Sequence, residues 1–400
     1  MKPKLHIHSD CYKWGGSENM PGIFLQDPTI NQSFDVSFSY RYSEEYEKGM
    51  RKWVDLDPFK YKIPGKYIQE RIYPFHLPIT FLYKIKKYFP PIMALGYFTA
   101  VVDIMKMLKF FRRVKPDILH LNNGGYPGAL SCNLAAIVGR LAGIPKITYF
   151  ICSTTHNPWW LKPMTWMVKR AVTTFISASK HLRDHSKFLW KDKTNPGWNI
   201  ISNTIKSQVL ASRESVRQEL GIPDDEVVFL CMGDLVERKG FYRAIDSLAQ
   251  VSDIGVPRSL LIVGEGSEEQ LLRDRAKNKK KGVYRIISDL APSIHPYSII
   301  NVCDVLVVPS VGEEDWPNIM LIAMMYGKPI IASNILGFHE MVEHDYNGYL
   351  ANTEQGFSSM MTLLLDRDLR VAIGQRAQAR YEQKYRIDKI MGKYLELWNG

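Results

Sequence analysis

Cysteine is scarce in this sequence, and its five residues form no pattern that indicates a bond or a metal site. They are odd in number, widely spaced and include no C-x-x-C pair, which argues against a disulfide framework and against a zinc centre. The first ten residues, MKPKLHIHSD, contain neither an apolar run nor a small-residue cleavage site, so they do not direct export. We therefore expect a protein of the reducing cytoplasm.

Long hydrophobic runs are also missing. The longest, residues 88–102, is interrupted by two prolines and a glycine and is shorter than the ~20 residues that a membrane-spanning helix needs. The sequence thus predicts no transmembrane helix. What remains is an ordinary globular composition, 46% apolar and 23% charged, in a chain of 400 residues, which is long enough to form two domains.

The formal net charge of +11 calls for an anionic partner or an unusually basic surface. Lysines and arginines are concentrated between Lys84 and Lys115, where they alternate with phenylalanines and tyrosines. Such a stretch can bind an anionic membrane surface, or it can be a helix with a solvated basic face and an aromatic core stripe. A nucleic-acid partner is not expected, because the sequence contains no recognised module for it.

Apolar strand candidates alternate with helical stretches along both halves of the chain. The first half offers LHIH, FDVSFSY, RIYPF, DILHL, KITYFI, TFISA and WNIIS, and the second offers VVFLCM, SLLIV, VYRII, VLVVP and PIIAS. Strands that alternate with helices predict parallel sheets. The polar segment NTIKSQVLASRESVRQELGIPDDE separates the halves and predicts a domain boundary near residues 206–212.

The most informative segment is residues 304–333, DVLVVPSVGEEDWPNIMLIAMMYGKPIIAS. VLVVP is typical of a strand covered on both faces, and Pro317 suits the first turn of a helix. The helix N–H groups would then lie at the carboxyl end of a strand, beside Glu313, Glu314 and Asp315, where phosphate is favoured. Carboxylates beside a phosphate fit a ligand that also carries hydroxyls, so we predict a site for a sugar attached to a diphosphate.

This segment resembles the donor-site signature of the group 1, glycogen-synthase-like retaining glycosyltransferases with GT-B fold, P-S-x(n)-E-x-F-P-N-x-x-L-E-A-M-A-x-G-x-P-V-I-A-S. In that family the first Glu holds hydroxyls of the transferred sugar, and Glu314 matches it. Amides that follow it hold the phosphate, and they correspond here to Pro317, Asn318 and Ile319. A second family Glu, which holds the nucleotide ribose, is replaced by Ile322.

Two further motifs of the second half fit the resemblance. GDLVERKG resembles the family's G-R-L-x-x-x-K-G, whose Arg and Lys neutralise the departing diphosphate. Lys239 and Gly240 match, Asp234 stands at the Arg position, and Arg238 is the nearby candidate to replace that Arg; the alternative for a lone Lys is a solvated surface residue. VGEG resembles the family's G-x-G-P near the nucleotide base, and we expect Gly264 to shape a loop there.

The first half matches the family more sparsely. Gly15 and Gly16 fit the family's G-G-x-E beside the donor phosphate, although a plain turn is the alternative, and we expect the glycines to allow positive φ. His156 lies near the position of a family histidine that contacts the sugar. His120 matches a strand-end histidine and is equally well a buried strand residue. The pair Pro21-Gly22 is expected to weaken the following helix.

The resemblance implies an α/β architecture of two Rossmann-like, doubly wound parallel-sheet domains that face each other across a cleft. Residues 1–207 would bind the acceptor, residues 208–385 the nucleotide sugar, and a C-terminal helix at 386–400 would pack back on the first domain. The implied activity is retaining transfer of a hexose-type sugar from a nucleotide-diphosphate sugar to a saccharide or lipid-linked saccharide, as in polysaccharide or lipopolysaccharide biosynthesis. No metal or other cofactor is expected, because Lys and Arg would balance the phosphate charge. Such an enzyme would lie in the cytoplasm, peripheral to the inner face of the cell membrane.

Two other functions stay open. Without the ribose Glu, and with Asp234 in place of Arg, the chain can be a degenerate relative that binds a sugar nucleotide without turnover. It can also be an epimerase of nucleotide sugars, which would need acid–base groups, and Glu18, His120 and His156 are the candidates.

Overall fold

The chain folds into two compact units, which we describe separately. The computed structural model describes residues 1–11, 14–41, 43–54, 104–153, 155–190, 197–207, 211–290, 294–312 and 314–400. The first unit comprises Met1–Ser202 and Met391–Gly400, and the second comprises Asn203–Ile390. The predicted strand RIYPF, the basic and aromatic stretch up to residue 103, and Glu313 lie outside the described residues.

A six-stranded parallel sheet in the order β2-β1-β3-β4-β5-β6 forms the centre of the first unit. Its central strands are buried along nearly their whole length, as expected for a sheet covered on both faces. The strand bounds are β1 Lys4–Ser9, β2 Asp35–Tyr40, β3 Ile118–Asn123, β4 Lys146–Ile151, β5 Thr174–Ser177 and β6 Gly197–Ile200.

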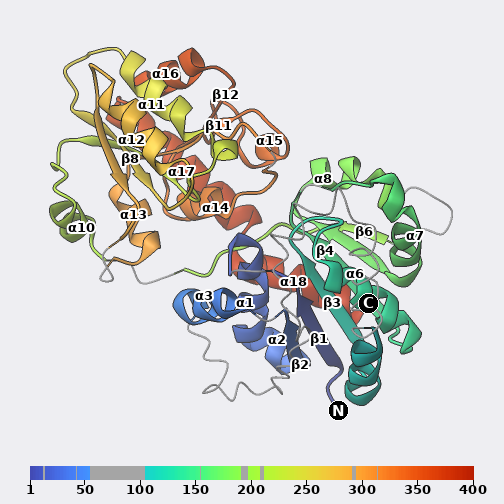
Figure 1. Ribbon diagram of the computed structural model, residues 1–400. Helices are drawn as coiled ribbons and strands as arrows, with labels where there is room; N and C mark the ends of the chain where they lie inside the picture. Colours follow the sequence, from blue (N-terminus) through green and yellow to red (C-terminus); the bar gives the residue numbers. More distant parts are fainter. Residues whose placement is uncertain are drawn as a thin grey trace. The chain divides into compact units, whose positions relative to one another are not determined.

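Helices cover both faces of this sheet (Figure 1). They are η1 Gly16–Glu18, α1 Asn19–Gln26, α2 Pro28–Ser33, α3 Glu44–Val54, a helix at 104–114, α6 Leu130–Leu141, η2 Trp159–Leu161, α7 Lys162–Ala171, α8 Lys180–His185 and α9 Lys187–Trp190. The pair Pro21-Gly22 does not prevent α1, because Pro21 stands in the first turn, where a helix tolerates a residue without an N–H. The pair therefore does not prevent the helix, and its effect on the helix's stability stays a prediction.

The C-terminal helix α18, Ile387–Asn399, ends in the first unit. Its Tyr394 and Trp398 are buried and pack edge-on against Phe24 of α1. Trp398 also contacts the ring of His120 in β3, whose Nδ1 lies 2.9 Å from the hydroxyl of Thr148. Burial lowers the pKa of His120 to about 3, so this histidine is a neutral core residue.

The second unit contains a six-stranded parallel sheet in the order β12-β11-β10-β7-β8-β9. Its strands are β7 Val227–Met232, β8 Arg258–Val263, β9 Val283–Ile287, β10 Val305–Val308, β11 Ile330–Ser333 and β12 Tyr349–Ala351. Read from β9, this is the 3-2-1-4-5-6 order of the Rossmann fold.

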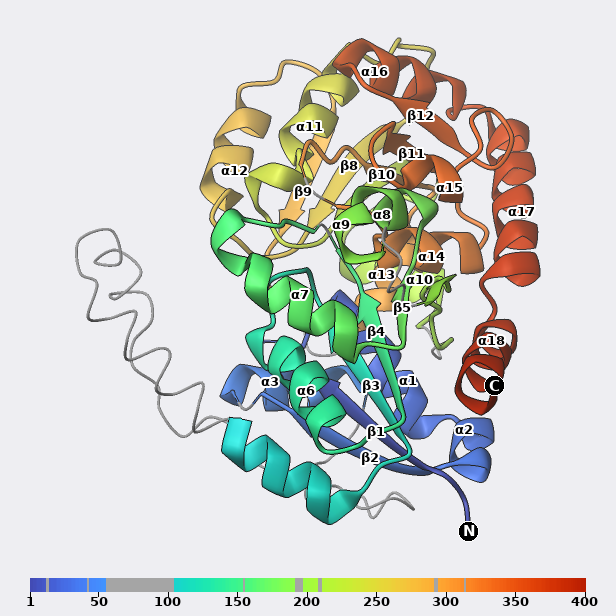
Figure 2. The ribbon, with the colours of Figure 1, turned by 90° about the vertical axis from the view of Figure 1, so that its right-hand side faces the viewer.

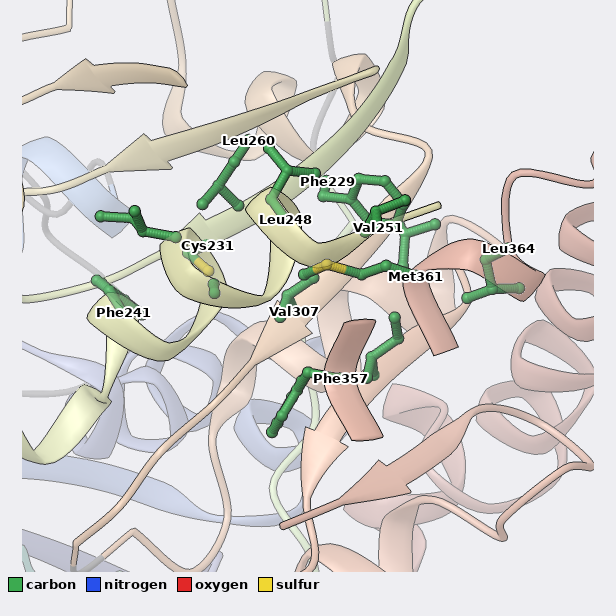
Figure 3. Close-up of a cluster of buried hydrophobic side chains, with 14 of the residues drawn as sticks. Phe229, Cys231, Phe241, Leu248, Val251, Leu260, Val307, Phe357, Met361 and Leu364 are labelled. Atoms are coloured by element: carbon green, nitrogen blue, oxygen red, sulfur yellow. The ribbon is translucent and has the colours of Figure 1, made fainter. Parts of the chain in front are cut away.

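Two helical layers enclose this second sheet. The helices are α10 Arg213–Glu219, η3 Glu237–Lys239, α11 Phe241–Gln250, α12 Glu269–Lys277, α13 Pro296–Val302, α14 Asn318–Met325, α15 Phe338–Met341, α16 Glu354–Leu363 and α17 Arg367–Lys384. Figure 3 shows the core on one face, where Leu248 of α11 and Phe357 and Met361 of α16 meet Phe229 and Val307 of the sheet. This packing fixes the strand ends from which the loops after β7 and β10 leave.

Candidate functional site

The strand order of the second unit reverses between β7 and β10. From β7 the chain continues to β8 and β9 on one side, and β10 is followed by β11 and β12 on the other. The loops that leave the carboxyl ends of β7 and β10 therefore run in opposite directions, and open α/β sheets bind ligands at such a switch point. The predicted residues Lys239 and Glu314 lie on these two loops.

The structure brings the charged side chains of the two loops together. The Lys239 ammonium donates a hydrogen bond to Oε1 of Glu314, and the Ser310 hydroxyl donates to Oε2 of the same carboxylate at 2.6 Å. A guanidinium nitrogen of Arg238 lies 3.9 Å from Glu314 Oε1. The Lys239 and Glu314 side chains are only 12% and 10% exposed, whereas that of Arg238 is 44% exposed. Lys239 is thus not a solvated surface residue.

Backbone contacts hold the two loops against each other. The N–H groups of Val311 and Gly312 donate to the carbonyl of Arg238 at 2.8 and 3.2 Å. Gly240 has φ +63°, and a Cβ at that position would lie 2.3 Å from the carbonyl oxygen of Pro309. Glycine is therefore required at position 240, because its backbone lies close to that of Pro309. Since it has no side chain, the η3 turn can pack against the loop after β10 and bring Lys239 next to that loop.

Gly264 shapes the neighbouring loop after β8. Its φ is +150°, and a Cβ would lie 1.8 Å from the carbonyl oxygen of Gly233, which follows β7. The Gly233 N–H in turn donates to the carbonyl of Val263 at 3.0 Å. The loops after β7 and β8 thus pack backbone to backbone, which agrees with a loop-forming glycine.

Helix α14 begins a few residues after Glu314, on the same loop. Pro317 is the N-cap residue with φ −73°, one position before the first turn in which the sequence placed it, and Asn318 and Ile319 form the first turn. The Asn318 side-chain oxygen accepts a hydrogen bond at 2.9 Å from the amide of Asn203, which is 4% exposed. Asn203, which lies three residues after the end of β6, therefore fixes the orientation of the first helical residue.

Sequence reasoning missed two of these polar contacts. In the sequence, Ser310 was considered as the serine of the P-S signature, and Asn203 as the first residue of the polar segment between the two halves. No local pattern pairs Ser310 with Glu314 or Asn203 with Asn318, since both contacts depend on how the loop after β10 folds back. The two residues that depart from the family pattern differ in burial. The side chain of Asp234 is exposed, and that of Ile322 is buried among apolar residues of α14.

The remaining predicted residues lie on the first sheet. Gly15 and Gly16 follow β1, and His156 follows β4, so all three occupy the carboxyl edge of that sheet. Gly15 is extended, with φ −135°, and neither glycine is among the described glycines with positive φ. The expectation of positive φ was therefore wrong. A Cβ at Gly15 would meet nothing within 4 Å, so the space beside it is open. His156 is exposed, and its backbone N–H donates to the backbone carbonyl of Tyr126 at 2.8 Å.

Glu18, at the switch point between β1 and β3, is fully buried. The Ser9 hydroxyl lies 2.8 and 2.9 Å from its two oxygens, the Asn122 amide donates at 3.1 Å, and the Tyr46 hydroxyl donates as well. Burial raises the pKa of Glu18, and the hydrogen bonds from Tyr46 and Ser9 oppose that rise. We interpret this carboxyl as an anchor that ties η1, and with it the Gly15-Gly16 turn, to β1, β3 and α3.

Substituting Glu18→Gln should improve stability relative to the native protein as the pH rises. Because the folded pKa is raised, the unfolded chain loses its proton first, and the native protein loses stability above the ordinary Glu pKa of about 4.3. The Gln variant cannot ionise and avoids this loss. Urea unfolding of both proteins between about pH 4 and pH 8 measures the difference; parallel profiles would show that Glu18 does not titrate with a raised pKa.

The described residues include neither a metal-binding cluster nor a membrane-spanning helix. Within the described ranges, no group of three or more His, Cys, Asp or Glu side chains is placed to hold a metal ion. Among the helices that the structure describes, none is both long and apolar enough to cross a membrane.

Residues 212–380, which contain this switch-point site, match the family model of glycosyl transferases group 1. The chain is 23% identical to N-acetyl-alpha-D-glucosaminyl L-malate synthase of Bacillus anthracis, over 98% of this chain and 96% of that protein. It is 28% identical to phosphatidyl-myo-inositol mannosyltransferase of Mycobacterium leprae, over 70% of this chain and 73% of that one.

Solved structures agree on the fold. Anabaena Alr3699/HepE in complex with UDP has a TM-score of 0.72 at 16% identity, covering 99% of both chains. Sucrose-phosphate synthase from Thermosynechococcus elongatus has a TM-score of 0.69 at 16% identity, covering 99% of this chain and 98% of that one. Residues 212–380 are therefore similar to the group 1 glycosyltransferases, and the chain has the GT-B fold with two parallel six-stranded sheets.

Proposed function

We propose that this glycosyltransferase moves a hexose-type sugar, with retention of anomeric configuration, from a nucleotide-diphosphate sugar to a saccharide or lipid-linked saccharide. The observation that carries the proposal is the meeting of Lys239 and Glu314 at the switch point of the second sheet. A cation and a carboxylate, both largely shielded from water, are what a ligand with a diphosphate and a ring of hydroxyls requires.

The ion pair suggests how the donor is received. In the structure, Lys239 and Glu314 pair with each other, and the Ser310 hydroxyl donates to the second carboxylate oxygen. A donor would replace this pair, because its phosphate oxygens accept from Lys239 and its sugar hydroxyls donate to Glu314. Both side chains would exchange one partner for another, so neither would be left buried and unpaired.

The start of α14 supplies the second half of the phosphate site. Its first turn follows Pro317 and lies at the carboxyl edge of the sheet, where N–H groups and the helix dipole favour an anion. Gly240 and Gly264 keep the adjoining loops free of side chains at their closest approach. Arg238, being more exposed and 3.9 Å from Glu314, would act as an auxiliary cation.

Transfer with retention is compatible with these groups. As the glycosidic bond breaks, the departing diphosphate gains negative charge, and fixed cations and amides stabilise that charge most in the transition state. The departing phosphate would itself take the acceptor's proton on the same face of the sugar, so a separate strong base is not required. We propose that Lys239 and Arg238 take the place of a metal ion.

The known relatives support a sugar-nucleotide donor. One solved neighbour, Anabaena Alr3699/HepE, was crystallised with UDP-glucose. Another relative is a lipopolysaccharide core biosynthesis glycosyltransferase of Rhizobium meliloti, 25% identical over 50% of this chain. The five cysteines are free thiols, which suits a reducing cytoplasm, and we place the enzyme there, peripheral to the inner face of the membrane and in polysaccharide or lipopolysaccharide synthesis.

A transfer assay with a panel of nucleotide sugars and saccharide acceptors tests this proposal. We expect sugar transfer or slow donor hydrolysis, with the anomeric configuration of the donor kept in the product. Binding of a donor without either reaction would instead support the degenerate relative. Conversion of the donor without acceptor would support an epimerase, although Glu18 and His120, two of its three candidate groups, are fully buried.

A further inference from the structure

The segment at residues 155–162, which follows β4 and includes η2, is fixed to its surroundings by hydrogen bonds; we call it the η2 segment. The hydroxyl oxygens of Thr155 and Ser186, both buried, lie 2.9 Å apart. The Thr165 hydroxyl of α7 donates to the side-chain oxygen of Asn157 at 3.1 Å. These contacts hold the backbone of the segment at the carboxyl edge of the first sheet, where parallel sheets place their binding loops.

Trp159 is the large apolar side chain of the η2 segment that faces solvent most strongly. It is 75% exposed, and among the large apolar side chains in the described part of the chain only that of Met1 is more exposed. Tryptophan is highly buried on average, so this exposure on a fixed backbone is unusual. His156 and Lys162, three residues away on either side, are exposed as well. An aromatic ring accompanied by two polar side chains has the composition of a ligand subsite.

The charged residues around the η2 segment all have the same sign. From residue 118 to residue 183 the sequence contains seven lysines and arginines and no aspartate or glutamate. Lys162 is the first residue of α7, whose first turn contains no acidic residue, although the helix dipole favours an acidic side chain there and disfavours a cation. Helix stability therefore does not account for Lys162. An anionic ligand does, because it would be attracted to a surface of this sign.

We propose that the η2 segment is a subsite for an acceptor saccharide that carries a carboxylate or a phosphate. The pyranose ring stacks on the indole of Trp159, whose electron-rich face attracts the polarised C–H groups of a sugar ring. The Lys162 ammonium pairs with the anionic substituent, and His156 hydrogen-bonds to a ring hydroxyl. The inference rests on the proposed transfer reaction and deepens it, because it narrows the acceptor to anionic saccharides.

Two other ligands of similar shape fit less well. A neutral saccharide presents hydroxyl donors and is best held by carboxylates, which only accept hydrogen bonds, and residues 118–183 contain none. A nucleotide also offers a ring and an anionic group, but the proposed site for the donor's diphosphate is built from Lys239 and the start of α14 in the second unit. Both ligands are therefore included in the test.

Ligand-observed NMR titration of the full chain, without donor, tests the subsite. The probes are methyl glucoside, methyl glucuronide and methyl glucoside 6-phosphate, with their galactose and mannose counterparts. We expect the anionic glycosides of at least one sugar to bind about tenfold more tightly than the neutral parent. Trp159→Ala should weaken this binding about tenfold, and Trp159→Phe, which keeps an aromatic face, should weaken it much less. Lys162→Glu should remove the preference for the anionic glycosides.

Matched controls come from the same unit. Trp166 of α7 is 55% exposed, with the Arg170 guanidinium 4.1 Å from the centre of its ring. Figure 2 shows α7 beside α6 on one face of the first sheet, and the two helices share a core there. Trp166→Ala, and Lys109→Glu on the exposed side of the helix at 104–114, should leave glycoside binding unchanged. Thermal unfolding checks that all variants are folded.

Four results would overturn the subsite. They are the absence of binding by every glycoside, tighter binding of the neutral glycosides, native-like binding by Trp159→Ala, and an equal loss in Trp166→Ala. A nucleoside diphosphate provides the remaining comparison, because its affinity should be the same for Trp159→Ala as for the native protein. Weaker binding of that nucleotide together with unchanged glycoside binding would assign the segment to the donor instead.

A transfer assay separates this inference from the transfer reaction itself. With the preferred anionic glycoside as acceptor, Trp159→Ala should raise the KM for the acceptor about tenfold and leave the KM for the donor and the rate of donor hydrolysis unchanged. A native protein that neither binds nor turns over any donor would refute the transfer proposal. The glycoside titration contains no donor, so it would still decide whether the η2 segment binds anionic saccharides.

Discussion

Replacing Lys239 with alanine is expected to lower kcat/KM about 10²–10³-fold, equivalent to about 3–4 kcal/mol of transition-state stabilisation. Its side chain is 12% exposed and its ammonium group is hydrogen-bonded to Glu314, so it acts where water screens charge poorly. Steady-state kinetics with the preferred donor measure the loss. Arg238→Ala should have a smaller effect, because its side chain is 44% exposed and lies 3.9 Å from the same carboxylate.

The Lys239 result requires a control for folding. Lys239→Ala leaves Glu314 with the Ser310 hydroxyl but without its cation, and some loss of thermal stability is expected. The double variant Lys239→Ala/Glu314→Gln removes that uncompensated charge and should recover stability without recovering activity. Lys277→Ala, on the exposed side of α12, should change neither. Wild-type turnover in Lys239→Ala would show that this lysine takes no part in the reaction.

Replacing Gly264 with alanine should be the most damaging glycine substitution in the second unit. The added Cβ would lie 1.8 Å from the Gly233 carbonyl oxygen, which is backbone and cannot rotate away, and φ +150° is a region that only glycine adopts readily. We expect a loss of about 3 kcal/mol or more in unfolding free energy, with donor binding lost as the β7 and β8 loops separate. Thermal unfolding with and without nucleotide sugar measures both effects.

Gly255→Ala provides the matched comparison for Gly264. It also has positive φ, +77°, but a Cβ there would meet nothing within 4 Å, so only backbone strain of about 1–2 kcal/mol is expected. Donor binding should survive in this variant. If Gly264→Ala and Gly255→Ala lower the unfolding free energy equally, the close backbone contact between the β7 and β8 loops adds nothing to the cost of the substitution.

The strands of the second unit could be predicted because they are buried on both faces and read as apolar runs, such as VVFLCM and VLVVP. The same criterion identified β3 to β5. The burial of individual side chains could not be predicted from the sequence. His120 and Glu18 are both fully buried, and their surroundings include residues of α18 and α3 that lie far away in the chain. Burial of this kind is a property of the packed units.

The candidate site could be predicted from the sequence where a charged residue follows the end of a predicted strand. Lys239 and Glu314 each follow a strand of the second sheet, and adjacency of β7 and β10 brings them into contact. The partners Ser310 and Asn203 were missed, because their hydrogen bonds depend on loop conformation. The basic stretch was interpreted by composition alone, which could not show that Phe110 and Phe111 are buried whereas Lys106 and Lys109 are exposed.

Calorimetric titration with a nucleoside diphosphate and with its sugar derivative tests the central claim most directly. If Lys239 holds the diphosphate and Glu314 holds the sugar, Lys239→Ala should weaken the binding of both ligands. Glu314→Ala should weaken only the binding of the sugar derivative, leaving the plain diphosphate bound as in the native protein or more tightly. Native-like affinity of both variants for both ligands would contradict the account.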